Sequence, residues 1–249
     1  MTTQELDALD ARAAAAGAPV KRSYVQRIFS EIAPRYDFLN RVLSGGIDRS
    51  WRRAAIAALG VDRRPAGAYL DLCAGTLDAG AAISKLRGFR GVVVAADFAE
   101  PMLREGRGKA PAAVLAPVVA DALTLPVADA SCDGAVVAFG IRNVVDMPAA
   151  FREVLRVLTP GARFVILEFT TPRLAIVRWI YGLYSRRVLP LVGALISGHP
   201  TAYQYLPDSI AQFPSAERLG EIMAESGFAN VSVVHLTFGI AALHVGEKQ

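Results

Sequence analysis

From residue 68 to the C-terminus, short apolar runs alternate with amphipathic, helix-like segments, and this alternation constrains the fold more than any other feature. The runs are nearly continuous in Val, Ala, Leu and Ile, as in strands buried on both faces of a sheet. Helices between successive strands make those strands parallel, so we expect an α/β fold with a doubly wound, mostly parallel sheet. The expected strands are Ala68–Cys73, Gly91–Ala96, Ala116–Ala120, Gly134–Phe139 and Arg163–Phe169, and the expected helices are Ala79–Leu86, Pro101–Arg107 and Met147–Leu158, the last stopped by Pro160 and Gly161.

The C-terminal part adds a helix and two further strands. Ser215–Ser226 has a helical pattern that ends at Gly227. Val231–Leu236 and Ile240–Gly246 are apolar runs joined by a short Thr-Phe-Gly turn. Because so short a connection can join only antiparallel strands, we expect an antiparallel hairpin at the edge of the sheet.

Polar-faced helices are expected before the sheet. Ser23–Ala33 and Asp37–Leu43 form two of them, separated by Pro34, and a third follows at about Arg49–Leu59 with Asp48 as its N-cap. The chain is therefore predicted to have a flexible tail at residues 1–20 and a single domain at residues 21–249. That domain carries an N-terminal helical cap and an inserted helical segment at about residues 171–214.

Composition excludes several classes of protein. Hydrophobic residues make up 53% of the chain and charged residues 20%, which supplies a full core and rules out global disorder. The net charge of +4 contains no long run of like charge, so no nucleic-acid partner is expected. The two cysteines lie far apart and the three histidines form no H-E-x-x-H pattern, so neither a disulfide scaffold nor a metal site is expected. The first ten residues lack a signal-peptide pattern, and arginines and a proline interrupt the longest apolar stretch, so a cytoplasmic location is expected.

Ligands of open α/β sheets bind beyond the carboxyl ends of the strands, so the residues after each strand carry the candidate site. In the turn after the first strand, Asp71 to Asp78, Gly75 allows backbone N–H groups to approach a ligand. Asp97 ends the second strand about 20 residues later, where an acid can accept hydrogen bonds from both ribose hydroxyls. Asp121 ends the third strand and can accept an adenine amino proton, while the Ala122 N–H meets a ring nitrogen. Each residue alone is equally compatible with an ordinary turn or cap, but together they indicate a nucleoside.

Two nucleoside cofactors compete for this site. A dinucleotide pyrophosphate needs a helix N-terminus free of side chains, whereas Leu77 and Asp78 occupy that turn here. Asp78 would also face the phosphates with a second negative charge. The methionine tail of S-adenosylmethionine carries an ammonium and a sulfonium and tolerates this acid. The residues therefore favour S-adenosylmethionine, and a nicotinamide oxidoreductase is the disfavoured alternative.

Several stretches give the chain a resemblance that covers roughly residues 23–247. It resembles the ubiquinone/menaquinone biosynthesis C-methyltransferases of the UbiE type, within the class I methyltransferases. This implies the Rossmann-like class I fold and S-adenosylmethionine as cofactor. The supporting stretches are Val25–Trp51, Asp71–Asp78, Asp97–Leu103, Asp121–Pro126, Phe139–Val144, Leu155–Phe169 and Tyr203–Pro214.

The family pattern assigns cofactor contacts and also shows two departures. A Ser of the family that contacts the cofactor is Ala138 here, so one side-chain hydrogen bond is absent. The family turn usually reads Gly-Thr-Gly-Asp, and Leu77 replaces its second Gly. If this position needs a positive φ, Leu77 is strained by about 1–2 kcal/mol, and if it needs only close approach, Leu77 crowds the methionine tail. The expected cofactor-binding residues are Asp71, Gly75, Thr76, Asp97, Asp121, Ala122 and Ala138.

The implied reaction is methyl transfer to a ring carbon of a reduced quinone, and demethylmenaquinol is the favoured substrate. Removing a proton from a ring hydroxyl gives a phenolate that pushes electron density onto the ortho carbon. We expect Arg142 to stabilise that phenolate and Asn143 to hold a ring hydroxyl or a water. A loop Arg paired with Asp146 and an Asn capping the next helix are the structural alternatives. The candidate proton acceptors are a water held by Arg142 with Asp78 or Asp37, and, second to it, His199.

The resemblance also implies where the quinol ring and its polyprenyl tail lie. Aromatic faces would sandwich the ring. The expected substrate-binding residues are Tyr36 and Asp37 from the N-terminal cap and Tyr203, Tyr205 and Ser209 from the inserted segment. Each of these could equally belong to an ordinary helix.

Residues 174–189 read as a basic amphipathic helix. Ile176, Trp179, Ile180 and Leu183 recur at helical spacing with arginines interleaved, as in helices that lie in a lipid interface. We expect peripheral contact with the inner face of the cytoplasmic membrane, and a core-facing helix or a homodimer surface is the alternative. Two other functions stay open: a methyltransferase for another aromatic small molecule, and a weakened or non-catalytic member of a quinone-biosynthesis assembly.

Overall fold

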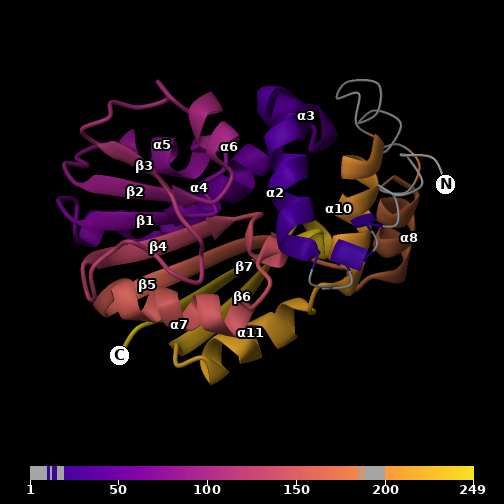
Figure 1. Ribbon diagram of the computed structural model, residues 1–249. Coiled ribbons are helices and arrows are strands. Elements are labelled where there is room, and N and C mark those ends of the chain that lie inside the picture. The colour runs from indigo at the N-terminus through magenta and orange to yellow at the C-terminus, as the bar shows by residue number, and fades with distance from the viewer. Residues whose placement is uncertain (1–9, 12, 16–19, 185–186, 188–199) are drawn as a thin grey trace.

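The computed structural model describes residues 10–11, 13–15, 20–184, 187 and 200–249, and a seven-stranded sheet forms its centre (Figure 1). The strand order is β3-β2-β1-β4-β5-β7-β6. Neighbouring strands from β3 to β5 are parallel, whereas β7 is antiparallel to both β5 and β6. The doubly wound sheet and its antiparallel edge hairpin are therefore confirmed. The strands are β1 (Ala68–Leu72), β2 (Val92–Asp97), β3 (Leu115–Val119), β4 (Cys132–Ala138), β5 (Leu158–Phe169), β6 (Ala229–Leu236) and β7 (Ala241–Glu247).

Helices cover both faces of the sheet because successive side chains of each buried strand point to opposite faces. On β4, Val136 packs into the core beneath one helical layer, while Ala135 and Val137 pack into the core beneath the other. Each core is therefore shared by a helical layer and alternate residues of the same strands. The first layer comprises α4 (Asp48–Leu59), α5 (Asp78–Ser84) and α6 (Glu100–Glu105), and the second comprises α7 (Met147–Val157) and α11 (Ala216–Glu225).

Side chains at the helix starts fix the second layer. The Asp146 carboxylate accepts a hydrogen bond from the Ala149 N–H at 2.9 Å and caps α7. The Ser215 hydroxyl accepts from the Arg218 N–H at 3.2 Å and caps α11. These caps satisfy N–H groups that the first helical turn leaves without partners. Asp146 thus serves α7 and is not an ion-pair partner of Arg142, whose carboxylate partner is Glu168.

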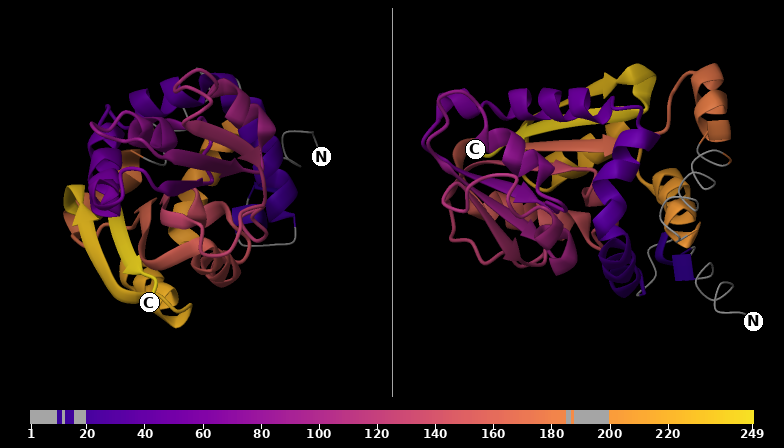
Figure 2. Two further views of the ribbon diagram at one scale, coloured as in Figure 1. Left: turned by 90° about the vertical axis from the view of Figure 1, so that its left-hand side faces the viewer. Right: turned by 90° about the horizontal axis from the view of Figure 1, so that it is seen from above.

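A second group of helices stands beside the carboxyl ends of the parallel strands (Figures 1 and 2). The group comprises α2 (Lys21–Ile32), the 3-10 turn η1 (Ala33–Arg35), α3 (Tyr36–Leu43), α8 (Ala175–Leu183) and α10 (Pro200–Gln212). In the core of this group, Tyr24 and Ile28 of α2 pack with Tyr205 of α10. Ala11 and Ala14, from the stretch predicted as a tail, are buried in the same core. The division into tail, domain, cap and insert remains a proposal.

Two local predictions were wrong. Asp48 does not cap α4, because Ile47 is the N-cap residue and Asp48 lies in the first turn, where its carboxylate accepts from the Ser44 hydroxyl. Strand β5 begins at Leu158 directly after α7, whereas Arg163 was expected to start it. Its register against β4 shifts between Cys132 and Gly134, and such an irregularity accommodates a proline and a positive-φ glycine inside a strand. Among the helices that the structure describes, none has the length and apolar character needed to cross a membrane.

Candidate active site

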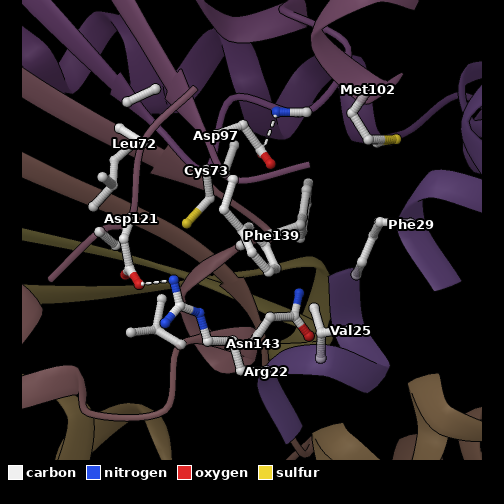
Figure 3. Close-up of a pocket in the computed structure, with 18 of the residues that line it drawn as sticks. Arg22, Val25, Phe29, Leu72, Cys73, Asp97, Met102, Asp121, Phe139 and Asn143 are labelled. Atoms are coloured by element: carbon white, nitrogen blue, oxygen red, sulfur yellow. Dashed lines mark hydrogen bonds and ion pairs between the residues drawn. The ribbon is translucent and has the colours of Figure 1, made fainter. Parts of the chain in front are cut away.

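A cavity lies where the carboxyl ends of β1, β2, β3 and β4 meet helix α2 (Figure 3). It encloses about 770 Å³, including its open mouth, and we call it the nucleoside cavity. Its walls are apolar at Leu72, Met102 and Phe139, and two carboxylates, Asp97 and Asp121, also line it. This is the place predicted from the strand ends.

Asp97 stabilises the turn after β1, which contains Gly75. Its Oδ2 accepts a hydrogen bond from the Gly75 N–H at 2.8 Å, and its Oδ1 accepts from the Ala99 N–H at 2.8 Å. Burial raises the pKa of this carboxyl, although the N–H donors partly offset the rise. Gly75 has a φ of +51°, and a Cβ there would lie 3.3 Å from the Met102 Cε. A side chain at this position would therefore narrow the cavity.

Asp121 lies at the opposite wall of the nucleoside cavity. Its Oδ1 accepts from the Leu123 N–H at 3.0 Å, and its Oδ2 forms an ion pair with Arg22 of α2 at 2.8 Å (Figure 3). Ala122 and Ala138 also line the cavity, and neither carries a polar side chain into it. A planar base would meet apolar walls and one carboxylate on this side.

Leu77 adopts the left-handed conformation, with φ +67°. Its side chain is buried and turns away from the nucleoside cavity toward Gly106, where a Cβ would lie 2.4 Å from the Leu77 Cγ. Leu77 is not among the residues that line the cavity. Of the two alternatives, the structure shows backbone strain rather than crowding of a ligand.

Asp71 and Thr76 do not line the nucleoside cavity. The Asp71 carboxylate accepts from the Gly80 N–H at 2.7 Å, which ties β1 to α5, and burial raises its pKa to about 7. The Thr76 hydroxyl donates to the Asp37 carboxylate. Both residues therefore stabilise the turn after β1 from the side that faces away from the nucleoside cavity.

Lys109 draws Asp37 and Asp78 together behind the same turn. Its Nζ donates to Asp37 Oδ2 at 2.5 Å and to Asp78 Oδ1 at 2.6 Å. Neither acid lines the nucleoside cavity or the apolar cavity described next. This geometry gives no support to the hypothesis that Asp37 or Asp78 holds the water that accepts the proton.

A larger cavity of about 1860 Å³, open at its mouth, adjoins the nucleoside cavity, and we call it the apolar cavity. Phe29, Tyr36 and Phe139 line both cavities and form their shared wall. Helix α2 serves both, because Val25 faces the nucleoside cavity and Ile28 faces the apolar one. Its other walls come from α3, α4, α8, α10 and the 3-10 turn η5 (Thr237–Gly239).

Arg142 is buried at the wall of the apolar cavity. It lies in the 3-10 turn η3 (Ile141–Asn143), and its Nη1 donates to Glu168 Oε1 and to the Phe139 carbonyl, both at 2.7 Å. Burial alone would lower the pKa of Arg142, but the Glu168 carboxylate together with Tyr36 and Tyr205 outweighs burial, and the pKa is raised. Its Nε is buried and has no hydrogen-bond partner in the described part of the chain. A charged donor is thus available beside the cavity.

Glu168 was missed in the sequence, although its signal was present as one acid in the apolar run Ile166 to Phe169. It is fully buried, and its Oε1 also accepts from the Phe169 N–H at 2.9 Å. Because no buried carboxylate is stable without partners, an acid at that position predicts a basic residue nearby.

The remaining predicted substrate residues lie in different places. Asn143 lines the nucleoside cavity, and its Oδ1 accepts from the Tyr205 hydroxyl at 3.1 Å. Tyr205 lines the apolar cavity, and burial raises its pKa to about 12. The Ser209 hydroxyl donates to the Leu206 carbonyl and faces neither cavity. The Tyr203 side chain and His199 fall outside the described residues.

The residues present fit an adenosine-type cofactor in the nucleoside cavity. Asp97 and Asp121 supply acceptors at two separate points of its lining. A Cβ at Gly140 would lie 2.4 Å from the Cys73 Cβ, so only glycine lets these two cavity-lining segments pack this closely. Within the described ranges, no group of His, Cys, Asp and Glu could hold a metal ion.

The chain is similar in sequence to several known proteins. A model of the ubiE/COQ5 methyltransferase family matches residues 18–248. A demethylmenaquinone methyltransferase from Thermus thermophilus is 48% identical over 223 residues, which cover 89% of this chain and 100% of that protein. A ubiquinone/menaquinone biosynthesis C-methyltransferase from Geotalea daltonii is 44% identical over 232 residues, covering 92% of this chain and 97% of that protein.

A solved structure supports the fold. A SAM-dependent methyltransferase from Thermotoga maritima superposes with a TM-score of 0.64 at 19% identity, covering 90% of this chain and 99% of that one. At this identity the likeness concerns the fold alone, and it confirms the predicted class I methyltransferase architecture.

Proposed function

The chain belongs to the ubiE/COQ5 methyltransferase family, so it is an S-adenosylmethionine-dependent C-methyltransferase of quinone biosynthesis, and we propose that its acceptor is a polyprenylated demethylmenaquinol. The predicted enzyme class and cofactor are confirmed by this membership. The relative with 48% identity is named for demethylmenaquinone, which supports a naphthoquinol over a benzoquinol.

The observation that carries this proposal is the pair of adjoining cavities. A cofactor in the nucleoside cavity and a flat apolar acceptor in the apolar cavity would meet at Phe29, Tyr36 and Phe139, the shared wall. Methyl transfer needs the two reactants in line and close, with water excluded. At about 1860 Å³, the apolar cavity also has room for part of a prenyl tail. Its lining, which is mostly aliphatic and aromatic, suits such a tail.

The polar residues have separate tasks in this proposal. When bound, S-adenosylmethionine supplies an electrophilic methyl group. Asp97 and Asp121 accept hydrogen bonds from its ribose and adenine. Arg142, which lines the apolar cavity, donates from its guanidinium to the phenolate oxygen and stabilises the charge that develops there. Asn143, held by the Tyr205 hydroxyl, orients a ring hydroxyl or a water at the boundary.

Contact with a lipid surface is the second part of the proposal and rests on α8. Its apolar residues Ile176 and Trp179 are 63% and 66% exposed, so this helix does not face the core. Ile180 and Phe238 are also exposed, and both line the apolar cavity. The mouth through which a prenyl tail would enter is thus rimmed by apolar side chains. We place the enzyme in the cytoplasm, docked on the inner face of the membrane.

The first experiment follows label from S-adenosylmethionine into demethylmenaquinol, with Arg142→Gln as the test variant and Arg104→Gln as the control. Arg104 is exposed and pairs with Glu100, so its loss leaves both cavities intact. We expect label in the quinone, a loss of at least 100-fold in Arg142→Gln, and none in Arg104→Gln.

Other outcomes identify the alternatives. Label unaffected by Arg142→Gln removes the phenolate role of Arg142. No label, with cofactor binding intact by calorimetry, indicates another aromatic acceptor. No label and no cofactor binding indicates the non-catalytic member of an assembly.

Liposome flotation tests the lipid contact. Trp179→Ser is compared with Val234→Ser, because Val234 is 51% exposed on β6 and does not line the apolar cavity. We expect Trp179→Ser to weaken binding to anionic vesicles several-fold and Val234→Ser to leave it unchanged. Equal binding of the two variants would contradict the proposal. A change in mass by ultracentrifugation on Trp179→Ser would instead show the homodimer surface.

A further inference from the structure

We propose that Asp48 is the group that accepts the proton of the ring hydroxyl when the acceptor is methylated. This inference rests on the proposed function, since it concerns the acceptor in the apolar cavity. The reaction needs such a group, because the acceptor carbon becomes nucleophilic only when the neighbouring hydroxyl is deprotonated.

Asp48 is the one carboxylate among the described residues that line the apolar cavity. Its side chain is 13% exposed, so it is largely shielded from water yet reaches the cavity wall. Asp37 and Asp78 are bound by Lys109 away from both cavities. Glu168 is held by Arg142 and by the Phe169 N–H and does not line the cavity.

Asp48 has two polar neighbours, and they occupy its two oxygens differently. Its Oδ1 accepts a hydrogen bond from the Ser44 hydroxyl at 2.8 Å, whereas its Oδ2 forms an ion pair with Arg52 Nε at 3.6 Å that is too long for a hydrogen bond. The buried Arg52 Nε has no hydrogen-bond partner in the described chain. Among the described residues, Oδ2 of Asp48 therefore accepts no hydrogen bond and keeps its lone pairs for a substrate hydroxyl.

The pair also lies beside the place where methyl transfer would occur. The Arg52 guanidinium is 5.5 Å from the centre of the Phe139 ring, which is part of the wall shared with the nucleoside cavity. The Tyr36 hydroxyl experiences the positive charges of both Arg52 and Arg142. Asp48 on α4 and Arg142 on η3 both line the apolar cavity, so the ring oxygen that loses its proton to Asp48 would receive the Arg142 hydrogen bond.

Asp48 carries the proton only while the methyl group is transferred. The hydroxyl O–H bond breaks, and its proton forms an O–H bond on Asp48. The phenolate's electron pair forms the bond from the ortho carbon to the methyl carbon as the carbon–sulfur bond breaks and its pair stays on sulfur. The ring carbon then loses its own hydrogen as a proton, and the ring oxygen recovers a proton from Asp48. The net result is one proton released to solvent and the carboxylate restored.

The test compares Asp48→Asn with Asp62→Asn, an exposed acid in the 3-10 turn η2 (Val61–Arg63) that follows α4 and lies outside the apolar cavity. We expect Asp48→Asn to lower kcat by 100- to 10,000-fold, with cofactor affinity unchanged. Its residual kcat should rise about tenfold per pH unit, because phenolate then forms without the base. Asp62→Asn should behave as wild type.

Asp48→His provides a readout that a structural role would not change. Imidazole becomes protonated at a pH about 2 units above an ordinary carboxylate, so the acidic limb of kcat should move upward by roughly that amount. A near-wild-type kcat in Asp48→Asn, or an acidic limb of kcat that does not move in Asp48→His, overturns the proposal for Asp48. If the wild-type protein methylates the acceptor in the same assay, the proposed function stands. Absence of methylation in wild type refutes the proposed function itself. If Asp48→Asn fails to fold, the acidic limb of Asp48→His decides.

Discussion

Replacing Leu77 by glycine should lower the free energy of unfolding less than replacing it by alanine does. At most buried positions glycine is the more destabilising of the two. Leu77 has a φ of +67° and a fully buried side chain packed against Gly106. Alanine loses the buried side chain, at about 2–5 kcal/mol, and keeps the left-handed strain. Glycine loses the same contacts but relieves about 1–2 kcal/mol of strain, part of which its freer unfolded chain offsets. We therefore expect Leu77→Gly to be more stable than Leu77→Ala by about 1 kcal/mol.

Leu219 is the matched control, because it is fully buried in α11, where glycine is worse than alanine by about 1 kcal/mol. Urea unfolding of the four variants gives the two differences, which should have opposite signs. Calorimetry should also find cofactor affinity in Leu77→Gly within about twofold of wild type, because the side chain points away from the nucleoside cavity. Leu77→Ala equal to or more stable than Leu77→Gly would refute the reasoning.

Four further outcomes are expected. Glu168→Gln leaves the buried Arg142 charge unpaired and should lower the free energy of unfolding by about 3–5 kcal/mol in urea, with partial recovery in the double variant Arg142→Gln/Glu168→Gln. Asp97→Asn should weaken cofactor binding about 10- to 100-fold by calorimetry, because one amide oxygen replaces two acceptors, while Glu100→Gln on the surface should not. Arg22→Gln should tighten cofactor binding by up to about fivefold, since it frees Asp121, and weaker binding would show that Arg22 contacts the cofactor. The pKa of Asp71 is raised to about 7 in the folded chain, so the folded state binds more protons than the unfolded state between about pH 4 and 7. The free energy of unfolding should therefore fall by up to about 4 kcal/mol as the pH rises across that range in wild type, but not in Asp71→Asn.

The strand ends were predictable because burial on both faces leaves a continuous apolar signal that polar residues interrupt. Asp97 and Asp121 therefore came directly from the sequence, and both lie on the nucleoside cavity. The start of β5 was not predictable, since Pro160 and Gly161 read as a stop signal and only the register shift against β4 accommodates them.

The apolar cavity was only partly predictable, because it is built by side chains from helices that lie far apart in the sequence. Tyr36, Arg142 and Tyr205 were predicted through the family resemblance, and all three line it. Asp48 was read as a helix cap, since local sequence cannot show that a first-turn acid also faces a cavity closed by α8 and α10. Glu168 was missed because its partner, Arg142, lies in another element.

Helix α2 lies between the two cavities and contributes residues to each, with Phe29 shared by both. A helix moves largely as a rigid unit, so a shift that one ligand imposes on it also alters the wall that the other ligand meets. The affinities for the cofactor and the quinol are then coupled, and thermodynamic linkage requires the coupling to be reciprocal. A bound quinol would therefore change the affinity for the cofactor by the same factor by which a bound cofactor changes the affinity for the quinol.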